Sequence, residues 1–183
     1  MIPIISEGDL RRSSVAIILT EENEIILEVR AANLPHQPGD ICLPGGALEE
    51  GETPEQAAIR EVREELLVEK VDLLSPVSIF VSGLQEIHVF LCKVQDDYQG
   101  TFQYSEVQEI LKIPMSFFRN TKPEIHEIGW MTDLGENFPY DRIYGGRNYK
   151  WREWKSQVRF YQYGEYVIWG ITARILEDFA KRN

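Results

Sequence analysis

Basic residues, cysteines and long apolar runs are all scarce in this sequence, and each shortage excludes a class of protein. The chain has 19 lysines and arginines against 30 aspartates and glutamates, which gives a formal net charge of −11 at pH 7. A broad basic surface that follows the phosphates of a nucleic acid polymer is therefore excluded. The two cysteines, Cys42 and Cys92, are too few for a disulfide framework.

No segment reaches the roughly 18 consecutive apolar residues that a membrane-spanning helix needs. Internal repeats, low-complexity runs and linkers rich in Ser, Gly or Pro are also missing. The chain has 183 residues, of which 43% are apolar. We therefore expect a single domain over residues 1–183, in a soluble, cytoplasmic protein with no membrane and no nucleic acid polymer as partner. The oligomeric state stays open between a monomer and a homodimer.

Mixed strand and helix patterns predict a layered domain of the α/β or α+β class. Two runs rich in Val and Ile, at residues 14–19 and 24–29, flank a polar turn and indicate a β-hairpin. Further strands are predicted at residues 41–43, 77–81, 87–94, 107–113 and 158–163. A last helix is predicted at about 170–181, with a buried stripe of Ile171, Ile175, Leu176 and Phe179.

A glutamate-rich helix is predicted to begin at Pro54. Thr53 suits the N-cap position, and Gln56 three residues later completes a capping box. The apolar face of this helix repeats every four residues and consists of Ala58, Val62 and Leu66.

The opposite side of this helix has the composition of a cation site. Glu61, Glu64 and Glu65 are three and four residues apart, so their carboxylates can converge on one side. Like charges at this spacing cost a few tenths of a kcal/mol per pair. Mg²⁺ prefers oxygen ligands and removes that cost, and Arg60 can hold a carboxylate in place. The alternative interpretation is a solvated acidic face.

The whole segment of residues 46–68 resembles the Nudix box. The resemblance implies a mixed β-sheet sandwiched between α-helices, and a diphosphate that is cut by a metal-activated water. It implies Mg²⁺ or Mn²⁺ as cofactor. The metal ligands that it implies are Glu61, Glu65, Glu64 and the carbonyl of Gly45. The catalytic residues that it implies are Glu64, Glu52 and Arg60. It also implies that the ion pair between Glu52 and Arg60 orients the helix.

Leu67 is the one departure from the box, which has glycine at this position. A glycine would take the left-handed conformation that ends a helix, and a residue with a side chain loses about 1 kcal/mol or more there. Either Leu67 is left-handed or the helix ends in another way. Because Leu67 has no ligand group, the departure concerns the helix end and not the chemistry.

Residues 27–46 resemble the coenzyme A pyrophosphatase branch of the Nudix family. Asp40 and Leu43 stand where that branch usually has glutamine and phenylalanine, and residues 168–173 are also similar to it. The resemblance implies a small-molecule substrate, coenzyme A or an acyl-CoA, and the products 3′,5′-ADP and (acyl-)4′-phosphopantetheine. The residues expected to bind the substrate are Arg30, His36, Gly45 and Gly46.

Several alternatives stay open at this point. The general base is Glu64, or else Glu106 or Glu109 outside the box. The substrate can instead be another dinucleotide such as ADP-ribose or NADH, or the chain can be a sensing module of the same fold without turnover. Nine aromatic residues between 140 and 166 are expected mainly to pack in the core and at interfaces, although some can stack on an adenine.

Overall fold

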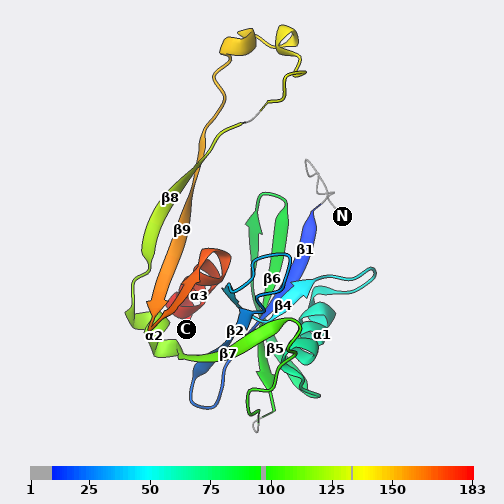
Figure 1. Cartoon of the computed structure of the whole chain (residues 1–183), viewed down its shortest axis with the longest axis vertical. Helices are drawn as coiled ribbons and strands as arrows, with labels where there is room; N and C mark the ends of the chain where they lie inside the picture. The colour runs from blue at the N-terminus through cyan, green and yellow to red at the C-terminus, as the bar shows by residue number, and fades with distance from the viewer. Residues whose placement is uncertain (1–9, 96–97, 133) are drawn as a thin grey trace.

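The computed structural model describes residues 10–95, 98–132 and 134–183, which form three sheets and three α-helices (Figure 1). The first sheet has the strand order β4-β1-β6-β5. Its strands are β1 (Arg11–Ile18), β4 (Gly45–Ala47), β5 (Val71–Ser82) and β6 (Gln85–Val94). Strand β1 runs parallel to β6 and antiparallel to β4, so this sheet is mixed.

The second sheet, of order β3-β2-β7, consists of β2 (Glu24–Arg30), β3 (Ile41–Cys42) and β7 (Val107–Pro114). The third sheet, of order β10-β9-β8, consists of β8 (Glu124–Trp130), β9 (Trp154–Tyr163) and β10 (Tyr166–Trp169). The helices are α1 (Pro54–Leu66), α2 (Met115–Asn120) and α3 (Gly170–Arg182).

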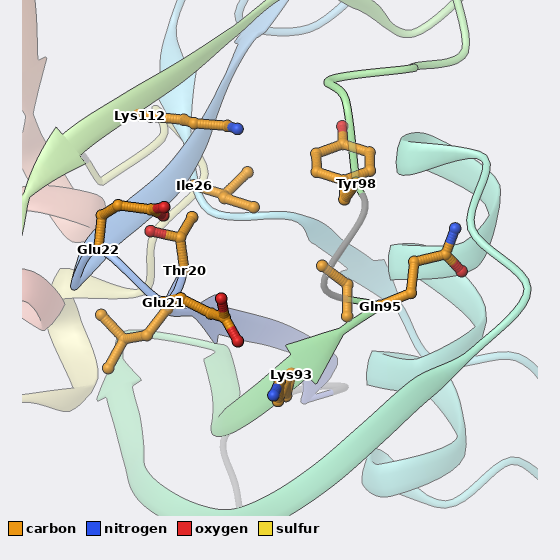
Figure 2. Close-up of a pocket in the computed structure, with 10 residues that line it drawn as sticks. Thr20, Glu21, Glu22, Ile26, Lys93, Gln95, Tyr98 and Lys112 are labelled. Carbon is orange, nitrogen blue, oxygen red and sulfur yellow. The ribbon is translucent and has the colours of Figure 1, made fainter.

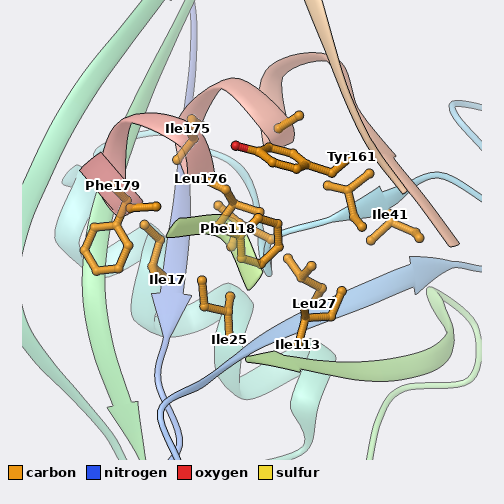
Figure 3. Packing of buried hydrophobic residues seen from close by; sticks show 14 of the residues in the cluster. Ile17, Ile25, Leu27, Ile41, Ile113, Phe118, Tyr161, Ile175, Leu176 and Phe179 are labelled. Atoms are coloured by element: carbon orange, nitrogen blue, oxygen red, sulfur yellow. The ribbon is translucent and has the colours of Figure 1, made fainter. Parts of the chain in front are cut away.

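Two hydrophobic cores lie on opposite faces of strands β1 and β2. Successive side chains of a strand point to opposite faces. Ala16, Ile18 and Ile26 therefore pack with the apolar face of α1. Ile17 and Ile25 face the other way and pack with α2 and α3 (Figure 3). The expected arrangement of mixed sheets between helices is confirmed.

The hairpin predicted from residues 14–19 and 24–29 is wrong. Strands β1 and β2 belong to different sheets and share only the isolated bridge between Leu19 and Ile25. The polar turn between them is present, but β1 pairs with β6 and β4, whereas β2 pairs with β7 and β3. The two strands thus pair with segments far along the chain, and the two hydrophobic cores cover their faces.

Helix α1 follows the sequence prediction closely. Thr53 is the N-cap, and both hydrogen bonds of its capping box with Gln56 are present. The predicted apolar face of Ala58, Val62 and Leu66 is completely buried. This packing fixes which side of the helix, and so which glutamates, face the strand β4.

Leu67 ends the helix in the left-handed conformation, with φ 52° and ψ 44°, and its side chain is exposed. We expect Leu67→Gly to stabilise the protein by about 1 kcal/mol, because glycine adopts this conformation without the steric cost. Urea unfolding measures the change in the free energy of unfolding. Leu67→Ala keeps the left-handed strain and should not stabilise. Loss of catalysis without a change in stability would show that Leu67 is close to the chemistry.

Strands β8 and β9 form an arm that rises clear of the rest of the molecule (Figure 1). Two short 3₁₀ helices, η1 (Tyr140–Arg142) and η2 (Gly146–Asn148), lie at its far end. Of the aromatic residues expected in the core and at interfaces, Tyr161 is buried in the core, whereas Tyr144, Trp151 and Trp154 are exposed in the single chain. No helix in the described part of the chain is long and apolar enough to cross a membrane.

Candidate active site

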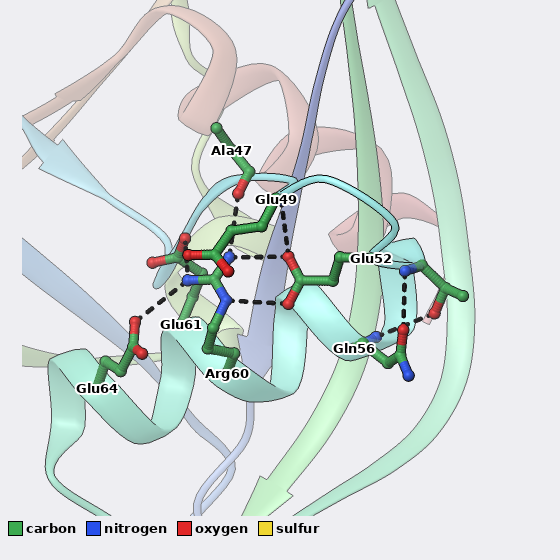
Figure 4. A network of polar contacts seen from close by, with 8 residues as sticks. Ala47, Glu49, Glu52, Gln56, Arg60, Glu61 and Glu64 are labelled. Carbon is green, nitrogen blue, oxygen red and sulfur yellow. Dashed lines mark hydrogen bonds and ion pairs between the residues drawn. The ribbon is translucent and has the colours of Figure 1, made fainter.

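Arg60 ties the loop before α1 to the helix (Figure 4). Its Nε and Nη2 donate parallel hydrogen bonds of 2.9 and 3.0 Å to the two carboxylate oxygens of Glu52. Nη1 donates to Glu61 at 2.9 Å and to Glu64 at 3.1 Å, and Nη2 also donates to the Ala47 carbonyl at 3.1 Å. The Arg60 guanidinium lowers the pKa of the Glu52 carboxyl. The structure thus places the carboxylates of Glu52, Glu61 and Glu64 around the guanidinium of Arg60.

Gly45 and Gly46 bring the backbone of β4 directly against the carboxylates of α1. The N–H of Gly45 donates a hydrogen bond of 2.8 Å to Oε2 of Glu65. A Cβ atom at Gly46 would lie 2.3 Å from Oε1 of Glu61, and one at Gly45 would lie 2.2 Å from the carbonyl oxygen of Ser14. Gly45 therefore requires glycine, whereas at Gly46 the missing side chain leaves room for the Glu61 carboxylate against the backbone.

Glu28 and Glu65, which we call the buried pair, lie side by side between β2 and α1. They are only 1% and 4% exposed. Glu65 accepts the bond from Gly45, whereas Oε1 of Glu28 has no hydrogen-bond partner among the described residues. Burial raises the pKa of both carboxyls, and the charge of Glu28 raises that of Glu65 further. Sequence reasoning missed Glu28, whose only signal was a glutamate inside an otherwise apolar strand.

The three candidates for the general base have different surroundings. The side chain of Glu64 is 58% exposed and pairs with Arg60. Glu106 follows Gln103, whose N–H donates to the Glu65 carbonyl at 2.8 Å, and the charge of Glu106 raises the pKa of both buried carboxyls. Glu109 instead accepts a hydrogen bond of 2.8 Å from the Tyr166 hydroxyl. The structure therefore brings Glu106 close to the box and engages Glu109 elsewhere.

The acidic cluster is chemically suited to a hard divalent cation. Glu61 and the buried pair offer only oxygen donors, and burial raises the pKa of Glu61 as well. A cation among them would offset the desolvation and repulsion that favour protonation. Within the described ranges, no three acidic, histidine or cysteine side chains are already arranged to hold a metal ion.

A cavity of about 420 Å³ adjoins Gly45. One side of it comes from the loop and strand around Arg30 and Ile41, and another from the start of α3, with Trp169 and Thr172. Segments more than a hundred residues apart in the sequence therefore meet here. The indole N–H of Trp169 donates to the Asp40 carboxylate at 3.3 Å across this junction.

Arg30 is a basic residue that lines this cavity. Its Nη2 donates a long hydrogen bond of 3.4 Å to the His36 carbonyl, and its Nε is buried without a hydrogen-bond partner in the described structure. The His36 side chain is exposed on the loop, so only its backbone supports the arginine. Cys42 also lines the cavity, and burial raises the pKa of its thiol to about 12, which fits a structural cysteine and not a nucleophile.

A second cavity, of only about 70 Å³, lies at the turn after β1 (Figure 2). Lys93, Lys112 and Tyr98 line it, and the Lys112 ammonium lies 5.9 Å from the centroid of the Tyr98 ring. This volume is well below the roughly 300 Å³ at which small-molecule sites begin. Of these two cavities, only the one beside Gly45 has the size of a small-molecule site, and we take it as the candidate substrate site because Gly45 also bonds Glu65.

Gly46→Ala should lower turnover at least several-fold while it leaves the fold intact. The new Cβ would meet the end of the flexible Glu61 side chain, which must swing aside. Steady-state rates and thermal unfolding measure the two effects. Gly129→Ala is the matched control, because a Cβ there would meet nothing within 4 Å. Equal activity of both variants would show that the position of Glu61 does not matter for catalysis.

The chain is similar in sequence and in structure to several known proteins. A family model described as the NUDIX domain matches residues 10–132. The uncharacterized Nudix hydrolase NudL of Enterobacter sp. is 26% identical over 189 residues, which is 97% of this chain and 86% of the relative. The 8-oxo-dGTP diphosphatase of Escherichia coli K12 is 49% identical over 53 residues, 29% of this chain and 40% of that protein. The crystal structure of a NUDIX hydrolase from Nitrosomonas europaea matches with a TM-score of 0.50 and 25% identity over 61% of each chain.

Proposed function

The chain belongs to the Nudix hydrolase family, and from that premise we propose that it hydrolyses the diphosphate of coenzyme A or an acyl-CoA. The observation that carries the proposal is the cavity beside Gly45. It joins the two segments that resemble the coenzyme A branch, residues 27–46 and 168–173. Gly45 lines this cavity and donates to Glu65, so a ligand bound here would place its diphosphate beside the acidic cluster.

In this proposal, Glu61 and Glu65 hold Mg²⁺ or Mn²⁺, with Glu64 and the Gly45 carbonyl as further ligands. When bound, the cation polarises the diphosphate oxygens and lowers the pKa of water. The Gly45 N–H keeps the Glu65 carboxylate oriented. Arg60 holds the box loop and releases Glu61 for the cation.

Glu106 is our preferred general base, which would take a proton from the attacking water. It lies near the buried pair and makes no ion pair within the described structure. Glu64 is the alternative, since it is exposed and Arg60 is the one ion-pair partner it has among the described residues. A comparison of Glu106→Gln and Glu64→Gln, with rates recorded against pH, decides between them. The variant that lacks the true base should lose the ascending limb of its pH–rate profile.

The substrate is tested by a screen of diphosphates with Mg²⁺ or Mn²⁺ and with product masses recorded. Release of 3′,5′-ADP and 4′-phosphopantetheine at the highest kcat/KM is the expected result. Faster hydrolysis of ADP-ribose or NADH than of coenzyme A would reject the substrate and leave the hydrolase assignment intact. Binding of these ligands without turnover would instead indicate a sensing module.

Arg30 is proposed to bind the 3′-phosphate of coenzyme A, because its buried Nε lacks a partner within the described residues and it lines the cavity. Charge-assisted hydrogen bonds to phosphate contribute roughly 1.5–3 kcal/mol. Arg30→Ala should therefore lower kcat/KM on coenzyme A about 10- to 100-fold, and on dephospho-coenzyme A much less. Equal losses on both substrates would mean that Arg30 supports the loop or binds the diphosphate instead.

A further inference from the structure

The arm of residues 124–160 is too exposed to be explained by the fold of one chain. Every residue of β8 is exposed, as are the first residues of β9. A free two-stranded ribbon is marginally stable at best in water. Besides the backbone ladder, its side-chain contacts include a hydrogen bond of 3.0 Å from the Trp130 indole to Ser156 and the exposed ion pair of Lys155 with Glu127. An exposed pair of this kind contributes only about 0–1 kcal/mol.

The end of the arm carries large aromatic side chains that the described part of the chain leaves exposed. Trp130, Trp151 and Trp154 are each 40% or more exposed, and Tyr144 is 98% exposed. Contiguous apolar patches on a surface mark sites of association. The aromatic side chains are nevertheless ordered among themselves, since the rings of Tyr149 and Trp151 lie 4.8 Å apart.

The charge of this region is opposite to that of the rest of the chain. Residues 140–155, which we call the tip, contain five basic and two acidic side chains, so the tip carries +3 and the remainder of the chain carries −14. Arg142, Lys150 and Arg152 make no ion pair within the described residues, and Arg147 lies 4.6 Å from the centroid of the Tyr140 ring. The tip is therefore a cationic, aromatic surface that points away from the acidic body of its own chain (Figure 1).

A second copy of this chain has the complementary surface. Exposed acidic side chains surround its box, among them Glu50, Glu55, Glu64 and Glu106. Seven paired residues at roughly 3.3 Å each give the ribbon of the arm a length of about 23 Å. That length is of the order of the radius of a domain of this size, so an arm can reach across a neighbouring copy. Two copies related by a twofold axis can exchange arms in the same way.

We propose that two copies of this chain associate through their arms, and that each tip lies beside the box of the other copy. Lys150 and Arg152 there supply cations for the phosphates of the partner's substrate, since Arg60 is already occupied by carboxylates. The association rests on the arm alone. The contribution of the tip to the partner's active site rests also on the proposed function.

The first test measures mass in solution. Sedimentation of the full chain should give twice 21.2 kDa for the wild type. The double variant Lys150→Glu and Arg152→Glu should shift toward the monomer. The control variant Lys70→Glu and Lys112→Glu changes two exposed lysines away from the tip by the same charge, and it should remain a dimer. A monomeric wild type overturns the proposal, whatever substrate the enzyme proves to cleave.

The second test asks whether the tip acts in the other copy. The variant Glu65→Gln has a defective box and an intact tip. The double variant Lys150→Glu and Arg152→Glu, which we call the tip variant, has an intact box and a defective tip. The tip variant alone should show at least a 10-fold higher KM for the best diphosphate substrate. A mixture of the two variants should recover a low KM, because the intact tip of one then serves the intact box of the other. A mixture no more active than its separate components overturns the action of the tip across the dimer.

Discussion

Glu65→Gln should lower turnover by orders of magnitude, and Glu61→Gln should do the same, while both variants stay folded. Each substitution removes a negative oxygen that we assign to the cation while the size of the side chain is kept. The measurement is kcat at saturating Mg²⁺, together with thermal unfolding of the metal-free protein. The stability of that form should stay level or rise, because a carboxyl that burial and repulsion disfavour has gone.

Glu177 provides the matched control for this experiment. It is also a buried glutamate, 6% exposed, but it is paired with Arg159, Arg174 and Lys181. Glu177→Gln should therefore destabilise the fold and leave kcat of the folded enzyme unchanged. Near wild-type turnover of Glu65→Gln would contradict the carboxylate–metal mechanism.

The difference between these two glutamates separates a structural from a functional role. Glu177 is surrounded by cations, so its charge is compensated within the fold. Glu65 receives one backbone N–H and faces another carboxyl. A chain that required only stability would not keep such a group buried. This contrast supports a ligand that compensates the charge from outside the protein.

Local chemistry made helix α1 predictable. Its N-terminus, apolar face and glutamate side all follow from spacings within about a dozen residues, and the structure contains each of them. The geometry also brings Glu52 to Arg60 and Glu61 to Gly46. The roles of these residues in metal binding and catalysis remain predictions for the experiments above.

Long-range pairing limited the prediction of the sheets. Strands β1 and β2 are adjacent in sequence, and a polar turn between two apolar runs favours a hairpin. Their partners β6 and β7 lie far along the chain, and no local pattern identifies them. The strand β8 was missed because its residues are exposed and do not alternate with a buried face. The exposure of the aromatic residues of the tip could not be predicted either, since composition does not reveal which of them the chain's own core covers.

Sequence reasoning missed Glu28 because its role depends on a contact between segments that are distant in the sequence. In sequence it is one charged residue in β2, and its neighbours Leu27 and Val29 indicate only a buried strand. Alternation along the strand turns Glu28 toward α1, where it meets Glu65. The buried pair thus joins two segments that no spacing rule connects.

Glu28→Gln should weaken binding of Mg²⁺ or Mn²⁺ roughly 10- to 100-fold, the range typical when a group beside a metal ligand is lost. The same variant should stabilise the metal-free protein by about 1–3 kcal/mol, since a buried acceptor without a partner is replaced by an amide that can donate to Glu65. Calorimetric titration of the metal and urea unfolding without metal measure the two effects independently of turnover. Glu24→Gln, on the same strand but outside the site, should change neither. If Glu28→Gln destabilises the metal-free protein and leaves the metal affinity unchanged, Glu28 is a structural residue and the cation site is confined to the box.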